Sequence, residues 1–169
     1  CEADLADLSQ AAALGVNAVM QPFVRSAGDL RVVRQTMAEN GLADAELFAK
    51  VENQPGLDAL PDWLALCDVV TIARGDLGSS LPLERLPAAQ KRIAALCRSR
   101  GRPFLVVTQL LHSMIDHPSP TRAEVLDIYN AVLDGADCLM LTGETAQGRY
   151  PLESTDWLIR VAQEAEKVR

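Results

Sequence analysis

Two carboxylates and a lysine stand where they could act together on an anionic substrate. Lys50 and Glu52 are two residues apart in a strand-like run, so their side chains point to the same face. Asp76 follows another such run and lies between Gly75 and Gly78, which permit a tight turn and close approach of a ligand to the backbone. Two carboxylates with few nitrogen ligands suit Mg²⁺ or Mn²⁺, and the cation would relieve their mutual repulsion. Taken singly, the Lys50–Glu52 pair also fits a plain salt bridge, and Asp76 a helix N-cap.

Backbone amides and hydroxyl groups add further candidates. The amides of Gly75 and Asp76 could hold a carboxylate or phosphate at the start of a short helix. Thr108 and Thr142 each end an apolar run, and a hydroxyl there can donate to a ligand carboxylate. The alternatives are a plain turn at Gly75–Asp76 and a half-buried strand threonine at Thr108.

These candidates follow short apolar runs that alternate with longer amphipathic stretches. The runs are too short for buried helices and predict strands at 17–21, 46–50, 69–73, 104–108 and 138–142. The stretches predict helices at 2–14, 27–39, 86–100, 121–133 and 153–167. Gly41 is expected as a helix C-cap, and Thr121 and Glu124 have capping-box spacing. Strands alternating with helices predict βαβ units, a parallel sheet and helices on the outside.

The polar candidates gather at the C-terminal ends of the strands, which form the active-site face of an α/β barrel. An open doubly wound sheet also binds ligands there, but the sequence has no GxGxxG or Walker motif. A (β/α)₈ barrel typically needs about 250 residues. The strands found here therefore predict a partial barrel with two unpaired edges and an exposed interior. We expect residues 1–169 to form one incomplete domain, completed by further chain or by a partner.

The composition argues against several classes of protein. Of 169 residues, 49% are apolar and the net charge is −7 with no basic stripe, so a nucleic-acid partner is not expected. No apolar run is long enough to cross a membrane. The cysteines are scattered, which argues against a zinc site or disulfide framework and favours a reducing, cytoplasmic setting. Cys67 and Cys138 lie in apolar runs, where we expect them to be buried.

Several segments resemble signatures of the pyruvate kinases, in order and at that family's spacing. They are Ala49-Lys-Val-Glu-Asn53, Ala73-Arg-Gly-Asp-Leu-Gly78, Thr108-Gln-Leu-Leu111, Pro120-Thr-Arg-Ala-Glu124, Asn130-Ala-Val-Leu-Asp-Gly-Ala-Asp137 and Met140-Leu-Thr-Gly-Glu-Thr145. One such motif is weak evidence, but the ordered set spans most of the chain. The resemblance implies the second half of a catalytic (β/α)₈ barrel. It also implies Mg²⁺-dependent phosphoryl transfer from phosphoenolpyruvate to ADP, giving pyruvate and ATP in glycolysis.

The resemblance assigns roles to the catalytic candidates. Lys50 resembles the lysine beside the transferring phosphoryl group, and Glu52 and Asp76 resemble the ligands of Mg²⁺ or Mn²⁺. Thr108 resembles the threonine that, with the Gly75 and Asp76 amides, holds the phosphoenolpyruvate carboxylate, and it is expected to help protonate the enolate. The residue types agree with these roles, because phosphoryl transfer needs positioning and charge neutralisation.

Three further residues receive roles from the resemblance. Arg74 is expected to bind substrate, and Thr142 takes the place of a serine near the family's proton relay. Arg122 resembles an arginine at the subunit interface that reaches toward the neighbouring active site. The expected protein partner is a second copy of the chain or the missing barrel half. The family also uses K⁺, whose ligands would lie outside this chain.

Departures from the family pattern keep two alternatives open. Pro22 and His112 replace a serine and a glutamate near the site, and Ser80 lies in a segment that lacks the usual glutamate. These changes modestly favour a divergent, non-catalytic barrel piece used for binding or assembly. A metal-dependent lyase or aldolase of the phosphoenolpyruvate/pyruvate barrel type would also use a Glu/Asp metal pair. Such an enzyme is not expected to match Lys50 or the later motifs so well.

Overall fold

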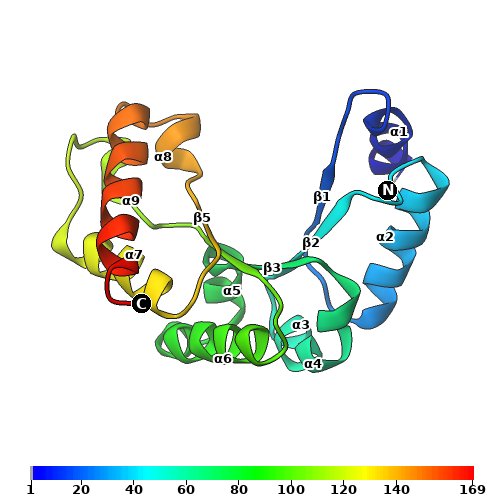
Figure 1. The fold of residues 1–169 in the computed structure, drawn as a ribbon, viewed down its shortest axis with the longest axis horizontal. Helices are drawn as coiled ribbons and strands as arrows, with labels where there is room; N and C mark the ends of the chain where they lie inside the picture. The colour runs from blue at the N-terminus through cyan, green and yellow to red at the C-terminus, as the bar shows by residue number, and fades with distance from the viewer. Residues whose placement is uncertain (1) are drawn as a thin grey trace.

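A computed structural model describes residues 2–169 and contains a five-stranded, all-parallel sheet. The strands lie in chain order: β1 (Ala18–Gln21), β2 (Glu46–Val51), β3 (Val69–Ala73), β4 (Phe104–Val107) and β5 (Cys138–Met140). Figure 1 shows the sheet bent into an arc, with the helices along its outer side. A curved parallel sheet with helices outside is the arrangement of a (β/α) barrel in part, which confirms the predicted fold class.

The helices alternate with the strands as the periodicity predicts. The longer ones are α1 (Glu2–Ala11), α2 (Ala27–Glu39), α6 (Leu86–Ser99), α7 (Arg122–Leu133) and α9 (Pro151–Glu166). Short helices also follow the strands: α3 (Gln54–Asp58), α4 (Leu60–Trp63), α5 (Arg74–Ser80) and α8 (Gly143–Ala146). Short 3₁₀ turns lie at Leu64–Leu66, Leu83–Arg85 and His112–Ile115. Within residues 2–169, every helix is too short or too polar to span a membrane.

Most of the core lies between the sheet and the outer helices. Leu47, Ala49 and Val51 of β2 alternate with more exposed residues and belong to this outer core, which also contains Trp63. The opposite, inner face of the sheet carries a much smaller buried cluster of Ala73, Leu105 and Val107, with Phe48, Val69 and Met140 packed against it. The two faces of the sheet are therefore unequally covered.

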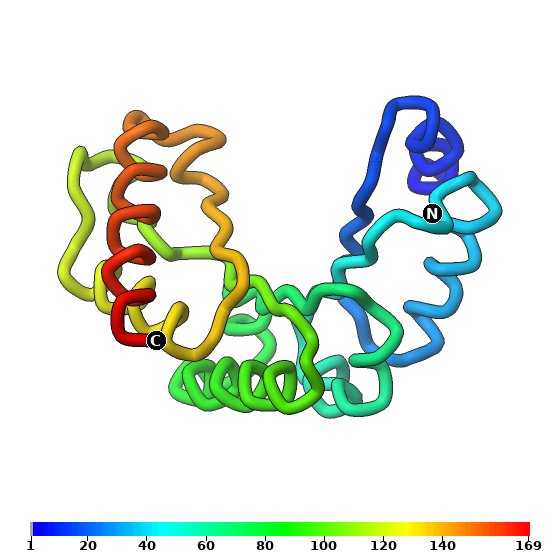
Figure 2. Tube along the Cα trace, in the orientation of Figure 1, coloured from blue at the N-terminus to red at the C-terminus, as the bar shows by residue number. Residues whose placement is uncertain are grey.

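The edge strands are the least buried part of the sheet. Every residue of β4 is buried, whereas β1 and β5 contain only exposed or partly exposed residues. Cys67 is buried as expected, but the expectation for Cys138 is wrong, because it lies exposed on edge strand β5. Figure 2 shows the two ends of the chain on opposite arms of the arc. Among residues 2–169, no segment of the backbone crosses the inner side of the arc between the two arms.

Helix ends follow the predicted capping chemistry. Gly41 follows α2 with a φ of +76°, and the Leu42 amide donates to the Met37 carbonyl at 2.8 Å. Thr121 and Glu124 form the predicted capping box at the start of α7. Glu124 also accepts hydrogen bonds from the Ser113 amide at 2.7 Å and the Ser113 hydroxyl at 2.6 Å. The Glu124 carboxylate therefore ties the start of α7 to the loop after β4.

Glu124 should make this connection sensitive to acid. Partial burial raises the pKa of the Glu124 carboxyl, but hydrogen bonds from Ser113 and Thr121 outweigh this and leave the pKa below its ordinary value. A lowered folded-state pKa stabilises the fold above the unfolded-state pKa and loses that effect as pH falls through the folded value. We expect Glu124→Gln to lose about 1 kcal/mol at pH 7, as capping changes typically do. The difference from wild type should shrink below about pH 4. Urea denaturation at pH 7 and pH 3.5 measures both, and a pH-independent difference would contradict the assignment.

Candidate active site

The ends of β2 and β3 bring the predicted lysine and carboxylates to one edge of the sheet. Lys50 Nζ lies 2.6 Å from Glu52 Oε1, so the two side chains share a face as their spacing predicts. The Glu52 side chain is fully buried, whereas that of Lys50 is 24% exposed. A buried carboxylate beside a partly accessible ammonium leaves the Lys50 charge available to a ligand at this edge.

Glu52 is fixed from a second side by the loop after β1. The Phe23 amide donates to Glu52 Oε2 at 2.7 Å. Oε1 has no hydrogen-bond donor among the described residues, although Lys50 lies close to it. The contact between Lys50 and Oε1 is an ion pair without hydrogen-bond geometry. The Lys50 ammonium compensates the charge on Oε1, and the carboxylate remains a candidate ligand for a hard cation.

Asp76 lies in the first turn of α5, directly after β3. Asp76 is exposed, and its side chain forms no hydrogen bond or ion pair with the described residues. Within residues 2–169, no three His, Cys, Asp or Glu side chains cluster as a metal cage. Mg²⁺ is usually held by one or two carboxylates, with substrate and water completing its shell. The donor set of Glu52 and Asp76 fits that kind of ion better than a fully protein-bound metal.

The loops after β3 and β4 are joined at the predicted carboxylate site. The Gly75 amide donates to Thr108 Oγ1 at 2.8 Å, and that hydroxyl donates to the Val107 carbonyl at 2.5 Å. Thr108 was expected to end the strand, but its φ of +76° turns the chain away and β4 stops at Val107. Two of the three groups expected to hold a ligand carboxylate therefore contact each other. To donate to a ligand, the Thr108 hydroxyl must rotate away from Val107.

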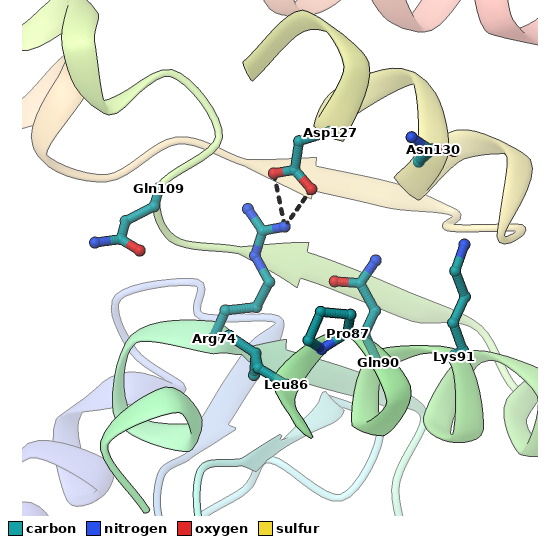
Figure 3. Close-up of a pocket in the computed structure, with 8 residues that line it drawn as sticks. All are labelled: Arg74, Leu86, Pro87, Gln90, Lys91, Gln109, Asp127 and Asn130. Atoms are coloured by element: carbon teal, nitrogen blue, oxygen red, sulfur yellow. Dashed lines mark hydrogen bonds and ion pairs between the residues drawn. The ribbon is translucent and has the colours of Figure 1, made fainter. Parts of the chain in front are cut away.

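Arg74 is engaged by protein groups. Its Nε and Nη2 donate to the Thr108 carbonyl at 3.2 and 2.7 Å, and its Nη1 lies 2.8 and 2.7 Å from the two carboxylate oxygens of Asp127. Figure 3 shows the Arg74 side chain reaching from the start of α5 to Asp127 on α7. These contacts line a groove of about 460 Å³ bounded also by Pro87 and Gln90 of α6. The guanidinium is thus placed to hold Thr108, and the expected contact of Arg74 with substrate stays a prediction.

Thr142 lies next to a second buried carboxylate, at the end of β5. The amide and hydroxyl of Thr142 donate to Glu144 Oε2 at 2.8 and 3.3 Å. Glu144 Oε1 accepts from the Leu111 amide at 3.2 Å, and the residue is only 1% exposed. Glu144 therefore joins the loops after β4 and β5 and orients Thr142. Thr142 lies one strand beyond Thr108 at the same edge of the sheet, as a relay residue would require.

The remaining candidates differ in how the structure uses them. Arg122 opens α7, is exposed, and has no side-chain partner among the described residues, and its role at an interface stays a prediction. His112 and Pro22 are also exposed. The hydroxyl of Ser80 accepts from the Gln54 amide at 3.2 Å, which connects the loops after β2 and β3.

Comparison with known proteins decides the family. Residues 1–155 match the family described as "Pyruvate kinase, barrel domain". The chain belongs to the pyruvate kinase family. It is 41% identical over 167 residues to a pyruvate kinase of Dictyostelium discoideum, a match that covers 99% of this chain and 33% of that protein. It is 43% identical over 166 residues to one of Kluyveromyces lactis, covering 98% and 33%. The chain thus spans about a third of the length of the curated relatives it matches.

Pyruvate kinase membership confirms the resemblance seen in the sequence, and the geometry adds two residues that the motifs did not reveal. Phe23 holds Glu52 through its backbone amide, and a phenylalanine in the sequence gives no indication of such a backbone contact. Asp127 holds Arg74, but nothing in its sequence position distinguishes it from any exposed helical aspartate. Both act on other residues of the candidate site.

Proposed function

We propose that this chain supplies the metal- and carboxylate-binding half of a pyruvate kinase catalytic site, active in the complete polypeptide. The reaction breaks the bond between phosphorus and the enol oxygen of phosphoenolpyruvate. A terminal phosphate oxygen of ADP forms the new bond to phosphorus, giving ATP, and the enolate carbon takes a proton to give pyruvate. The observation that carries the proposal is the Lys50–Glu52 pair at the sheet edge, in a chain of this family.

Each residue has a physical task in this proposal. Lys50 neutralises charge on the phosphoryl group as it leaves one oxygen and meets another. Glu52 and Asp76 would hold Mg²⁺ or Mn²⁺, which when bound supplies positive charge to the substrate's phosphate and carboxylate oxygens. Thr108, with the Gly75 and Asp76 amides, holds the substrate carboxylate, and Thr108 and Thr142 carry hydroxyls suited to passing a proton to the enolate.

Loss of the Asp76 charge should weaken binding of the divalent cation. Asp76→Asn keeps the size of the side chain but leaves a neutral and weaker ligand. We expect Mn²⁺ affinity in the complete polypeptide to fall by at least the ~10–100-fold typical of losing an outer-shell partner. Titration calorimetry measures the affinity, and a coupled assay of ATP formation from phosphoenolpyruvate and ADP measures turnover.

Asp62→Asn is a matched control, because Asp62 also lies in the first turn of a short helix, α4, and is exposed. It should bind Mn²⁺ as the wild type does. Equal affinity in Asp76→Asn and the wild type would remove Asp76 from the metal site.

A non-catalytic role is the second candidate, favoured by Pro22, Ser80 and His112. If it holds, the complete polypeptide binds Mn²⁺ and phosphoenolpyruvate but forms no ATP. Restoring the residue types usual in the family, with Pro22→Ser and His112→Glu, would then be expected to raise turnover. The lyase or aldolase alternative loses its support, because the chain belongs to the pyruvate kinase family.

The proposal includes the setting and the partners of the protein. Cys67, Cys97 and Cys138 are free thiols, which fits a reducing cytoplasm. The exposed Arg122 is proposed to contact a second subunit. The uncovered inner face of the sheet is proposed to pack against the rest of a barrel, and K⁺ would bind to groups supplied there.

A further inference from the structure

The loops after β1 and β2 are held together around Glu52 by three contacts. The Phe23 amide donates to Glu52 Oε2 at 2.7 Å, and Asn53 Nδ2 donates to the Val24 carbonyl at 3.3 Å. The Cα of Gly56 faces the same Val24 carbonyl. We call these five residues the β1–β2 clamp, since together they connect one loop to the other beside the candidate metal ligand.

Gly56 is the tightest point of the clamp. A Cβ atom at this position would lie 2.1 Å from the Val24 carbonyl oxygen, a distance that no side chain tolerates without movement. Gly56 itself is fixed on both sides. Its amide donates to Asn53 Oδ1 at 2.8 Å, and its carbonyl accepts from the indole of the fully buried Trp63 at 3.0 Å. A methyl group added to Gly56 would therefore displace Val24.

Displacement of Val24 would be passed to Glu52 through the preceding residue. Val24 is fully buried, and Phe23 has a φ of +51°, a conformation that non-glycine residues rarely adopt. Phe23 as a residue is 53% exposed, so packing around it does little to impose that conformation. The bond from its amide to Glu52 and the anchoring of Val24 maintain it. Movement of Val24 would therefore be expected to draw the Phe23 amide away from the carboxylate.

We propose that Gly56 is a positioning residue for Glu52, acting through Val24 and Phe23. The inference rests on the proposed function, in which Glu52 binds the divalent cation. The Phe23 amide occupies Glu52 Oε2, which leaves Oε1 directed at the Lys50 ammonium. Without the clamp, the carboxylate can rotate, and both its contact with Lys50 and its presentation to the cation change.

Gly56→Ala in the complete polypeptide tests the inference. We expect the dissociation constant for Mn²⁺, measured by electron paramagnetic resonance of the free ion, to rise about 10–100-fold, as for lost outer-shell partners. The kcat should fall, because both Lys50 and Glu52 are displaced. Gly28→Ala is the control: Gly28 also lies in the first turn of a helix, α2, and a Cβ there meets only the Ser26 hydroxyl, at 3.3 Å. It should bind Mn²⁺ like the wild type.

Asn53→Ser gives an independent test if Gly56→Ala fails to fold. Serine is a good N-cap and can still accept from the Gly56 amide, but its hydroxyl is too short to replace the Asn53 bond to Val24. We expect a melting temperature close to that of the wild type and weaker Mn²⁺ binding. Unchanged Mn²⁺ affinity in a folded Gly56→Ala, or failing that in Asn53→Ser, overturns the inference and leaves the proposed function standing. A wild type that binds no Mn²⁺ overturns both.

Discussion

Lys50→Met in the complete polypeptide is expected to lower kcat on the order of 10²–10³-fold, as losing one preorganised charge at a reacting centre does. The Lys50 ammonium lies at the accessible edge of the sheet beside buried Glu52, where it would meet the phosphoryl group during transfer. An interaction made mainly in the transition state lowers kcat when it is lost and changes substrate binding little. The apparent affinity for phosphoenolpyruvate should therefore barely move, because Thr108 and the Gly75 and Asp76 amides remain.

Lys91→Met provides the comparison for this prediction. Lys91 also forms an ion pair with a largely buried carboxylate, that of Asp134, but it lies on helix α6, whereas Lys50 lies on strand β2. If Lys50 served only to neutralise Glu52, the two variants would behave alike, losing stability and keeping their turnover. Steady-state kinetics and thermal melts of both variants separate the cases. A stable Lys50→Met protein with wild-type kcat would end the catalytic assignment.

The arrangement of strands could be predicted because burial leaves a regular trace in the sequence. The apolar runs that form β2, β3 and β4 are long enough to identify, and a parallel sheet fixes which ends carry the polar residues. Lys50 and Asp76 thus reach one edge as expected. The short helices α3, α4 and α8 were not predicted, because four or five residues are too few to show a helical period.

The detailed geometry of the site could not be predicted, because tertiary contacts impose it. Left-handed backbone at Phe23 and Thr108 has no local sequence signal, since neither residue favours it. At Thr108 the carbonyl is held by Arg74, and at Phe23 the amide is held by Glu52, both distant in sequence. The exposure of Cys138 likewise depends on β5 being an edge strand, which composition alone does not reveal.

The role of Arg74 is where the sequence and the structure lead to different experiments. The family resemblance predicts a substrate contact, in which case Arg74→Met would chiefly raise the KM for phosphoenolpyruvate. The structure places the guanidinium on the Thr108 carbonyl and on Asp127, and the Arg74 side chain is 9% exposed. In that case the variant should lose stability and also release Thr108 from its left-handed conformation.

We expect Arg74→Met to lower the free energy of unfolding by about 2–3 kcal/mol, below the 3–5 kcal/mol of a fully buried pair, because Asp127 is 36% exposed. The kcat should fall and the KM for phosphoenolpyruvate should rise, because Thr108 is proposed both to help protonate the enolate and to hold the substrate carboxylate. Arg74→Lys keeps the charge, but one ammonium cannot serve both the Thr108 carbonyl and the two Asp127 oxygens. This variant should therefore recover only part of the lost stability and part of the lost activity.

Asp127→Asn should reproduce the kinetic defect more mildly, although Asp127 has no contact with substrate in any proposed role. Urea denaturation and steady-state kinetics on these three variants test the assignment. A pure rise in KM for Arg74→Met, with normal stability and a silent Asp127→Asn, would instead support the predicted contact of Arg74 with substrate.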